Sequence, residues 1–164
     1  VMVLVREGSR PTIVLTERTA HLSSHAGEVA WPGGRVESAD VNPLAAGLRE
    51  TFEEIGVPQS AVTVIGELPG EISKFGLWVM PYVGLISADQ AVTANPSEVA
   101  SIFEIPMDWL SANPPKEIER LDRHGETQWA PVYSFGDYRV WGLTALILAS
   151  LVDISGISDH EPRR

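Results

Sequence analysis

The chain contains no cysteine, no long apolar run and few basic residues. Without cysteine it can form neither a disulfide nor a zinc–thiolate site, and it offers no thiol nucleophile. No stretch approaches the ~20 consecutive apolar residues that span a bilayer, and no signal-peptide pattern is present. From these absences we expect a cytoplasmic protein that does not bind or cross membranes.

Acidic residues outnumber basic residues by 22 to 12, which gives a net charge of −10. This balance argues against a nucleic-acid-binding surface. An anionic substrate would need locally placed cations, either a bound metal ion or a few arginines and lysines. The 164 residues, 44% of them hydrophobic, predict one globular domain over residues 1–164. The chain starts at Val1, in an apolar strand without an initiator methionine, so we expect that an N-terminal segment is missing.

Strand and helix patterns are mixed along the chain without regular β-α-β repetition, which favours an α+β layered sandwich. The predicted strands are Val1–Arg6, Thr12–Thr16, Val62–Leu68, Leu77–Ile86, Gln128–Phe135 and Tyr138–Trp141. The predicted helices are Pro43–Ile55, a short one at Met107–Leu110, and Leu143–Ile154. Glu98–Phe103 is expected to be a short connecting element, and the charged run Glu117–Glu126 an exposed loop.

The helix predicted from Pro43 to Ile55 has an acidic face. Asn42 is the expected N-cap and Gly56 the residue past the helix end. At about 100° per residue, Glu50, Glu53 and Glu54 fall within an arc of roughly 100°. The residues expected to face the core on the opposite side are Leu44, Ala45, Leu48, Phe52 and Ile55.

Three like charges on one helix face repel each other, so something must offset their repulsion. Such a face is often simply solvated. Here Ala46 and Gly47 leave space beside it, and Gly47 is costly in a helix interior, which indicates close approach of another group. Arg49 can orient a carboxylate such as Asp40 or Glu50. We therefore predict a metal site, and oxygen ligands favour Mg²⁺ or Mn²⁺ over Zn²⁺.

This helix and the turn before it resemble the signature of the Nudix hydrolases, Gly-x5-Glu-x7-Arg-Glu-U-x-Glu-Glu-x-Gly-U, where U is a bulky aliphatic residue. The matching positions are Gly34, Arg49, Glu50, Glu53, Glu54, Gly56 and Val57. Asp40 stands where the signature has glutamate, and the spacing from Asp40 to Arg49 is one residue longer. The resemblance implies an α/β/α sandwich with a mixed sheet between helices, and hydrolysis of a diphosphate joined to another group.

The longer spacing is similar to that of the coenzyme A pyrophosphatase branch of the family. The segment upstream resembles the extra motif of that branch, Leu-Leu-Thr-x-Arg-[Ser/Ala]-x3-Arg-x3-Gly-x3-Phe-Pro-Gly-Gly. The matching positions are Leu15, Thr16, Arg18, Gly27, Pro32, Gly33 and Gly34. Val14, Thr19, Ser23 and Trp31 depart from it. Ser97-Glu98-Val99 and Trp141-Gly142-Leu143-Thr144 are also similar to this branch.

The resemblance implies a role for each of several residues. Glu50, Glu53 and Glu54 would hold the metal, with Arg49 orienting them. Glu53 is the first candidate for the base that deprotonates the attacking water, and Glu98 is the second. The residues expected to contact the substrate are Arg18, His25, Gly33, Gly34 and Arg35. Each has a plainer interpretation, because a loop arginine can serve solubility, a loop histidine can be structural, and Glu98 can mark a helix start.

The expected reaction cuts coenzyme A, or an acyl or oxidised derivative, to 3′,5′-ADP and a 4′-phosphopantetheine product. Two alternatives stay open. One is a Nudix enzyme for another nucleotide substrate, such as ADP-ribose, because Ser23 replaces the arginine of the motif. The other is a catalytically idle nucleotide-binding regulator on the same fold, against which the intact Glu50, Glu53 and Glu54 argue. A calcium-binding module is disfavoured, because no EF-hand loop is present.

Overall fold

The computed structural model describes residues 1–21, 26–123 and 125–156. Its main sheet is mixed, with the strand order β3-β2-β1-β7-β4 and β8 paired to the other edge of β2. The strands are β1 (Met2–Arg6), β2 (Thr12–Arg18), β3 (Val29–Ala30), β4 (Thr63–Glu67), β7 (Tyr82–Ile86) and β8 (Val99–Pro106). β1 runs parallel to β7, and every other pairing in this sheet is antiparallel.

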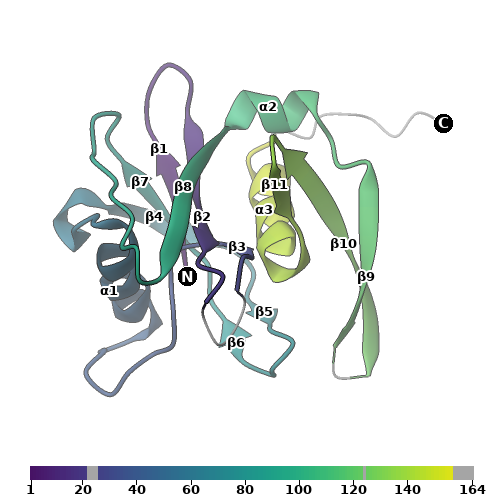
Figure 1. Cartoon of the computed structure of the whole chain (residues 1–164), viewed down its shortest axis with the longest axis horizontal. Helices are drawn as coiled ribbons and strands as arrows, with labels where there is room; N and C mark the ends of the chain where they lie inside the picture. Colours follow the sequence, from purple (N-terminus) through teal and green to yellow (C-terminus); the bar gives the residue numbers. More distant parts are fainter. Residues whose placement is uncertain (22–25, 124, 157–164) are drawn as a thin grey trace.

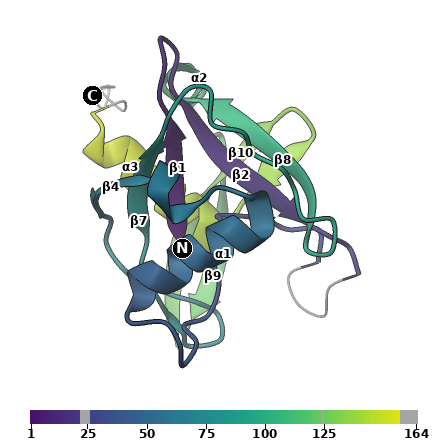
Figure 2. The same cartoon turned by 90° about the vertical axis from the view of Figure 1, so that its left-hand side faces the viewer.

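Alternating side chains of β1 divide the core into two halves. Val3 and Val5 face the cluster that contains Ile147 and Leu148 of α3 (Gly142–Ile154). Met2 and Leu4 face the cluster that contains Leu48 of α1 (Pro43–Ile55), since successive side chains of a strand point to opposite faces. Figures 1 and 2 show α1 across one face of the sheet and α3 on the other. The expected α/β/α sandwich with a mixed sheet is confirmed.

The termini of α1 follow the sequence prediction. The Asn42 side chain accepts a hydrogen bond from the Ala45 backbone N–H, 2.8 Å, and Pro43 opens the helix. Gly56 ends it in the left-handed conformation, φ 72°, with its N–H bonded to the Phe52 carbonyl. The expectation that Phe52 faces the core is wrong, because Phe52 is 57% exposed. The helix is rotated so that Glu54 and Thr51 are buried instead.

Gly47 packs against β1 rather than beside the acidic face. A methyl group on Gly47 would come 3.2 Å from the Met2 sulfur. The small residue therefore lets α1 approach the central strand. The expected close approach of another group is confirmed, but it takes place on the side of the sheet and not beside the acidic face.

Two segments that the sequence assigned to a short connecting element and to an exposed loop are strands. Val99–Pro106 forms the eight-residue β8 and pairs with β2 along its whole length. Glu117–Arg123 forms β9, paired antiparallel with β10 (Glu126–Phe135) over seven residues. Strand pairing uses backbone groups, so charged side chains that point to solvent do not prevent it. The expected hairpin across Gly136-Asp137 is confirmed, with β10 antiparallel to β11 (Tyr138–Val140).

The three-stranded sheet β9-β10-β11 lies beyond α3, and α2 (Met107–Ala112) joins β8 to it (Figure 1). The strand expected from Leu77 to Ile86 is interrupted before Pro81, so that β6 (Trp78–Val79) pairs with β5 (Glu71–Ile72) in a separate hairpin. A short 3-10 turn, Gln59–Ala61, follows α1.

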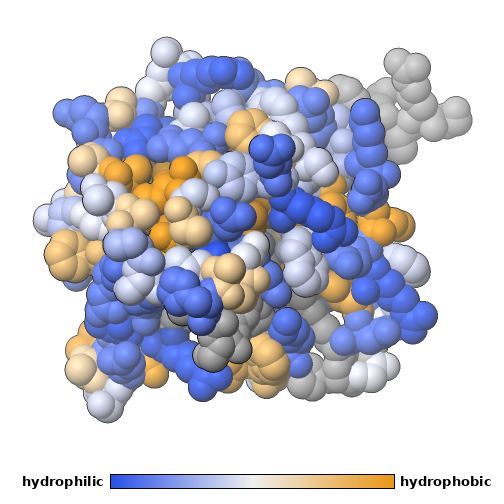
Figure 3. All heavy atoms as spheres, in the orientation of Figure 1, coloured by the Kyte–Doolittle hydropathy of each residue, from blue (hydrophilic) through white to orange (hydrophobic). Residues whose placement is uncertain are grey.

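The apolar α3 is a core helix. Its buried side chains include Ala145, Ile147 and Leu148, each at most 1% exposed. Within the described part of the chain, no helix is long and apolar enough to cross a membrane. In Figure 3 hydrophobic residues gather left of centre, over the region of β7 and β8, and hydrophilic residues cover much of the remaining face.

Candidate active site

Three carboxylates from two parts of the chain meet beside α1. Glu50 and Glu54 lie one helical turn apart on α1, and Glu98 comes from the segment just before β8. One carboxylate oxygen from each lies within 4.8 Å of the others. We call these three residues the carboxylate group.

Backbone hydrogen bonds fix Glu98 in this position. The segment before it is tied to the last turn of α1, where Asn95 N–H donates to the Glu54 carbonyl at 2.8 Å and Thr93 N–H to the Ile55 carbonyl at 2.9 Å. The Glu98 carbonyl then accepts from Thr19 N–H, 3.0 Å, just past the end of β2. Glu98 is therefore held between the helix and the sheet.

Glu54 is the most buried member of the carboxylate group, at 3% exposure. Its Oε2 accepts a hydrogen bond from Gly33 N–H, 3.1 Å, and its Oε1 lies 3.6 Å from Arg18 Nη1. Its pKa is raised to about 7, mainly by burial and also by the nearby charges of Glu50 and Glu98, against the opposing effect of Gly33 and Arg18. Burial also raises the pKa of Glu50. Ionisation of both carboxylates together is therefore unfavourable unless a bound cation offsets their charges.

Arg49 holds the outer side of the carboxylate group. Its guanidinium forms two hydrogen bonds of 3.0 Å with Asp40, from Nε and Nη2. Its Nη1 donates to Glu50 Oε1 at 3.0 Å. Arg49 was expected to pair with a carboxylate such as Asp40 or Glu50, and it pairs with both. Hydrogen bonding from Arg49 lowers the pKa of Asp40, and these contacts raise the pKa of Arg49 itself. Asp40 therefore fixes Arg49, which in turn orients Glu50.

The two glycines before α1 make room for this arrangement. A side chain on Gly34 would begin 2.4 Å from the Glu50 carboxylate carbon. Gly33 has φ 153°, and a side chain there would come 2.6 Å from Val1 Cα. Glycine at both positions brings the backbone against the carboxylates and lets Gly33 donate to Glu54.

The other sequence-predicted site residues are placed as follows. Glu53, expected to bind metal, is not part of the carboxylate group. It lies on the exposed side of α1, where its oxygens are 3.3 and 3.4 Å from Arg49 Nη1. Glu53 and Glu54 point about 100° apart around the helix axis, and the rotation of α1 that buries Glu54 leaves Glu53 exposed. The Arg35 side chain is exposed, and its carbonyl accepts from Arg49. His25 lies outside the described residues.

Two buried polar atoms at the end of β2 have no hydrogen-bond partner among the described residues. They are Arg18 Nε and Thr19 Oγ1. An unpaired buried donor is costly, which is typical of a position that a ligand completes. Arg18 was expected from the motif to contact the substrate, whereas Thr19, which departs from the motif, was not.

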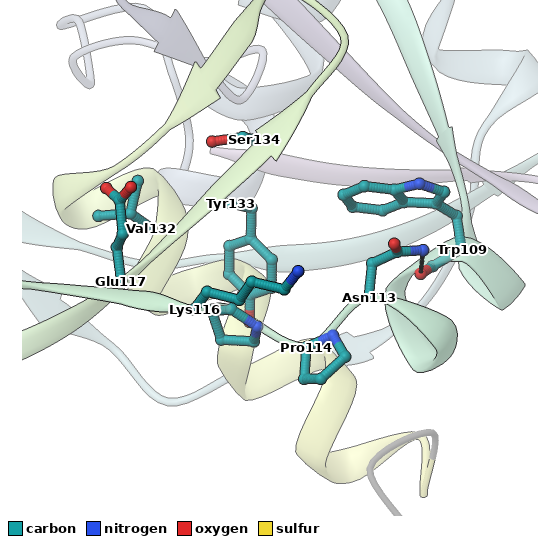
Figure 4. Close-up of a pocket in the computed structure, with 9 residues that line it drawn as sticks. Trp109, Asn113, Pro114, Lys116, Glu117, Val132, Tyr133 and Ser134 are labelled. Carbon is teal, nitrogen blue, oxygen red and sulfur yellow. Dashed lines mark hydrogen bonds between the residues drawn. The ribbon is translucent and has the colours of Figure 1, made fainter.

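The carboxylate group fits a hard divalent cation. Its three ligand atoms are all carboxylate oxygens, the donors that Mg²⁺ and Mn²⁺ prefer, and a cation would relieve their mutual repulsion. A separate pocket lined by Trp109, Lys116 and Tyr133 lies against α2 and β10 (Figure 4) and shares no residue with this group.

Comparison with known proteins agrees with this geometry. The NUDIX domain family matches residues 1–132. The chain is 41% identical over 151 residues to an uncharacterized Nudix hydrolase, NudL, of Enterobacter sp. (strain 638), covering 90% of this chain and 77% of that protein. It is 39% identical over 154 residues to NudL of Escherichia coli (strain K12), covering 92% and 79%.

Solved structures show the same fold. The RenU Nudix hydrolase from M. smegmatis matches 99% of this chain and 87% of its own with a TM-score of 0.61, at 15% identity. A MutT/nudix family protein from Enterococcus faecalis matches 98% and 62% with a TM-score of 0.58, at 19% identity. By its family match and its close relatives, this chain belongs to the Nudix hydrolase family and is a pyrophosphohydrolase.

Proposed function

We propose that this enzyme hydrolyses the diphosphate bond of coenzyme A or its derivatives, giving 3′,5′-ADP and a 4′-phosphopantetheine product. In the reaction a bond forms between water oxygen and one phosphorus, and the bridging P–O bond breaks. The water loses a proton, and the leaving phosphate takes the electron pair of the broken bond. Glu50, Glu54 and Glu98 would hold Mg²⁺ or Mn²⁺.

The observation that carries the proposal is the contact between the branch-specific motif and the carboxylate group. Arg18 lies 3.6 Å from Glu54, and Gly33 donates to the same carboxylate at 3.1 Å. Thr19, within the motif segment, bonds the backbone of Glu98 at 3.0 Å. The segment whose sequence resembles the coenzyme A branch therefore borders the groups that would act on the diphosphate.

Each residue has a proposed task in this site. The bound cation would neutralise diphosphate charge and lower the pKa of a bound water. Arg18 would meet a phosphate oxygen, since its buried Nε has no hydrogen-bond partner in the part of the chain that the structure describes. Gly33 and Gly34 would let the backbone approach the diphosphate, and Arg35 and His25 would bind more distant parts of the substrate. Arg49 and Asp40 keep Glu50 aligned.

Two carboxylates remain candidates for the base. Glu98 belongs to the carboxylate group, so it is near a cation-bound water. Glu53 is 3.3 Å from Arg49, outside the group, and reaches the water only if the side chain turns. We therefore rank Glu98 above Glu53 as proton acceptor, the reverse of the sequence-based ranking.

A substrate panel tests the function. Coenzyme A, dephospho-coenzyme A and ADP-ribose are assayed with Mg²⁺ and with Mn²⁺, and the products are resolved by chromatography. We expect the highest kcat/KM for coenzyme A, with loss on removal of the 3′-phosphate. Equal kcat/KM for coenzyme A and dephospho-coenzyme A, with faster turnover of ADP-ribose, would instead favour another nucleotide substrate. No turnover of any of them, with tight binding, would favour a regulator.

A further inference from the structure

The hairpin formed by β5 and β6, residues 71–79, exposes large apolar side chains. Trp78 is 63% exposed and Leu77 is 42% exposed. Phe75 and Ile72, in the same hairpin, are 62% and 42% exposed. Exposed hydrocarbon is unfavourable in proportion to its area, so its concentration in nine residues indicates a binding surface.

The hairpin holds these side chains on a firm backbone. Ser73 Oγ accepts hydrogen bonds from the N–H groups of Phe75 and Leu77, at 3.3 and 3.1 Å. The Trp78 indole N–H donates to Met80 Sδ at 2.8 Å, and its ring lies where a side chain on Gly70 would be, 2.3 Å from that position. A fixed aromatic surface loses little conformational entropy when a ligand binds.

The tip of the hairpin is linked to the candidate active site through Glu28 and Arg18. Lys74 Nζ at its tip lies 3.9 Å from Glu28 Oε1. The Glu28 carbonyl accepts from Arg18 N–H at 3.0 Å, and the Arg18 side chain reaches Glu54 at 3.6 Å. Figure 1 shows β5 and β6 at the same end of the molecule as β3 and the start of β8. A ligand held by the carboxylate group can therefore extend toward the hairpin.

We propose that the β5–β6 hairpin binds the apolar part of the substrate, the acyl chain of a coenzyme A thioester. This inference rests on the proposed function. Trp78 and Leu77 expose apolar surface. Contact with another apolar group is favourable because both surfaces are removed from water, and it does not depend on recognition of polar groups. The charged head at the tip, Lys74, is already paired with Glu28. The hairpin therefore selects for chain length, while the carboxylate group acts on the diphosphate.

The test compares kcat/KM for coenzyme A and its acetyl, butyryl, hexanoyl and octanoyl thioesters. For the wild type we expect kcat/KM to rise about twofold for each added methylene. This rise corresponds to half the free energy that full burial of a methylene would contribute. In Trp78→Ala, kcat/KM should fall about tenfold for octanoyl-coenzyme A and less than twofold for coenzyme A. The matched control is Trp129→Ala, an equally exposed tryptophan on β10, at 58%. It should change neither value by more than twofold.

A second readout separates this inference from the proposed function. Calorimetry in EDTA, which suppresses turnover, gives the Kd of coenzyme A and of octanoyl-coenzyme A for each protein. If the chain-length dependence of Kd exists and Trp78→Ala removes it, the hairpin proposal stands even when these compounds are not cleaved. Cleavage without chain-length dependence would overturn the hairpin proposal and leave the function intact.

Two further outcomes would also overturn the assignment. If Trp78→Ala weakened kcat/KM and binding equally for coenzyme A and its octanoyl thioester, the hairpin would bind a part of the substrate that both compounds share, and not the acyl chain. A change in oligomeric state of Trp78→Ala by light scattering, without any chain-length effect, would assign it to contact with a second copy of the chain.

Discussion

Helices α1 and α3 are each 13 residues long and pack on opposite faces of the same sheet, yet they differ in what they bury. α3 buries only apolar side chains and glycine, among them Ile147 and Leu148. α1 buries Glu54 together with Leu48 and Ile55, and burial raises the pKa of that carboxyl to about 7. One helix stabilises the fold, and the other accepts an unfavourable charge where a cation can bind.

The largest difference should appear when the buried carboxyl of α1 is neutralised. Glu54→Gln keeps the size of the side chain but removes a charge from the carboxylate group. We expect kcat/KM to fall by about a thousandfold, because a positioned cation supplies several kcal/mol to the transition state. Circular dichroism should show an intact fold. Near-normal turnover would remove Glu54 from the site.

The same comparison predicts the opposite result for α3. Leu148→Ala deletes a side chain with 0% exposure. The free energy of unfolding should fall by about 2–5 kcal/mol, measured by urea titration. Mn²⁺ affinity and kcat/KM of the folded variant should stay within about twofold of wild type. A large loss of Mn²⁺ affinity would contradict the separation of the two helices.

The buried carboxyl should also make stability depend on pH. Because folding raises the pKa of Glu54 from 4.5 to about 7, its stabilising contribution is complete below pH 4.5 and is lost as pH rises to 7. In metal-free protein, Glu54→Gln should therefore gain stability over wild type across this window, by at most about 3 kcal/mol at pH 8. Parallel urea titrations from pH 4.5 to 8 measure the difference. A constant difference would show that Glu54 is not destabilised by burial.

The smallest effect tests the glycine beside α1. Gly34→Ala places a methyl group against the Glu50 carboxylate, the flexible end of that side chain, so the carboxylate must shift. We expect Mn²⁺ affinity, measured by calorimetry, to fall about tenfold with little change in stability, since oriented ligands set metal affinity. The control is Gly66→Ala on β4, where no atom lies within 4 Å of the added carbon. Equal affinities in both variants would exclude the steric explanation.

Much of the fold was predictable because its signals are local. The cap at Asn42, the proline after it and Gly56 gave both ends of α1, and the Gly136-Asp137 turn gave the β10–β11 hairpin. β9 was missed because its strand character depends on pairing with β10 and not on its own charged side chains. The position of Phe52 was wrong because the contact of Gly47 with Met2 sets the rotation of α1.

The candidate site was predictable where its residues share one helix. Glu50 and Glu54 follow from helical spacing, and the pairing of Arg49 with Glu50 follows from their adjacency in the sequence. Glu98 lies 44 positions beyond Glu54, and it reaches the carboxylate group through backbone hydrogen bonds that Thr19 and Asn95 form. No sequence periodicity reports such bonds. The same limitation placed Glu53 in the metal site, since helical spacing alone does not distinguish it from its neighbours.

Glu98, and not Glu53, completes the carboxylate group. Mn²⁺ affinity measured by calorimetry for Glu98→Gln and Glu53→Gln, side by side with wild type, tests it most directly. We expect the Mn²⁺ affinity of Glu98→Gln to fall about tenfold or more, because the substitution removes one of three charged ligands, while that of Glu53→Gln stays within about twofold of wild type. Loss of affinity in Glu53→Gln with unchanged affinity in Glu98→Gln would contradict it.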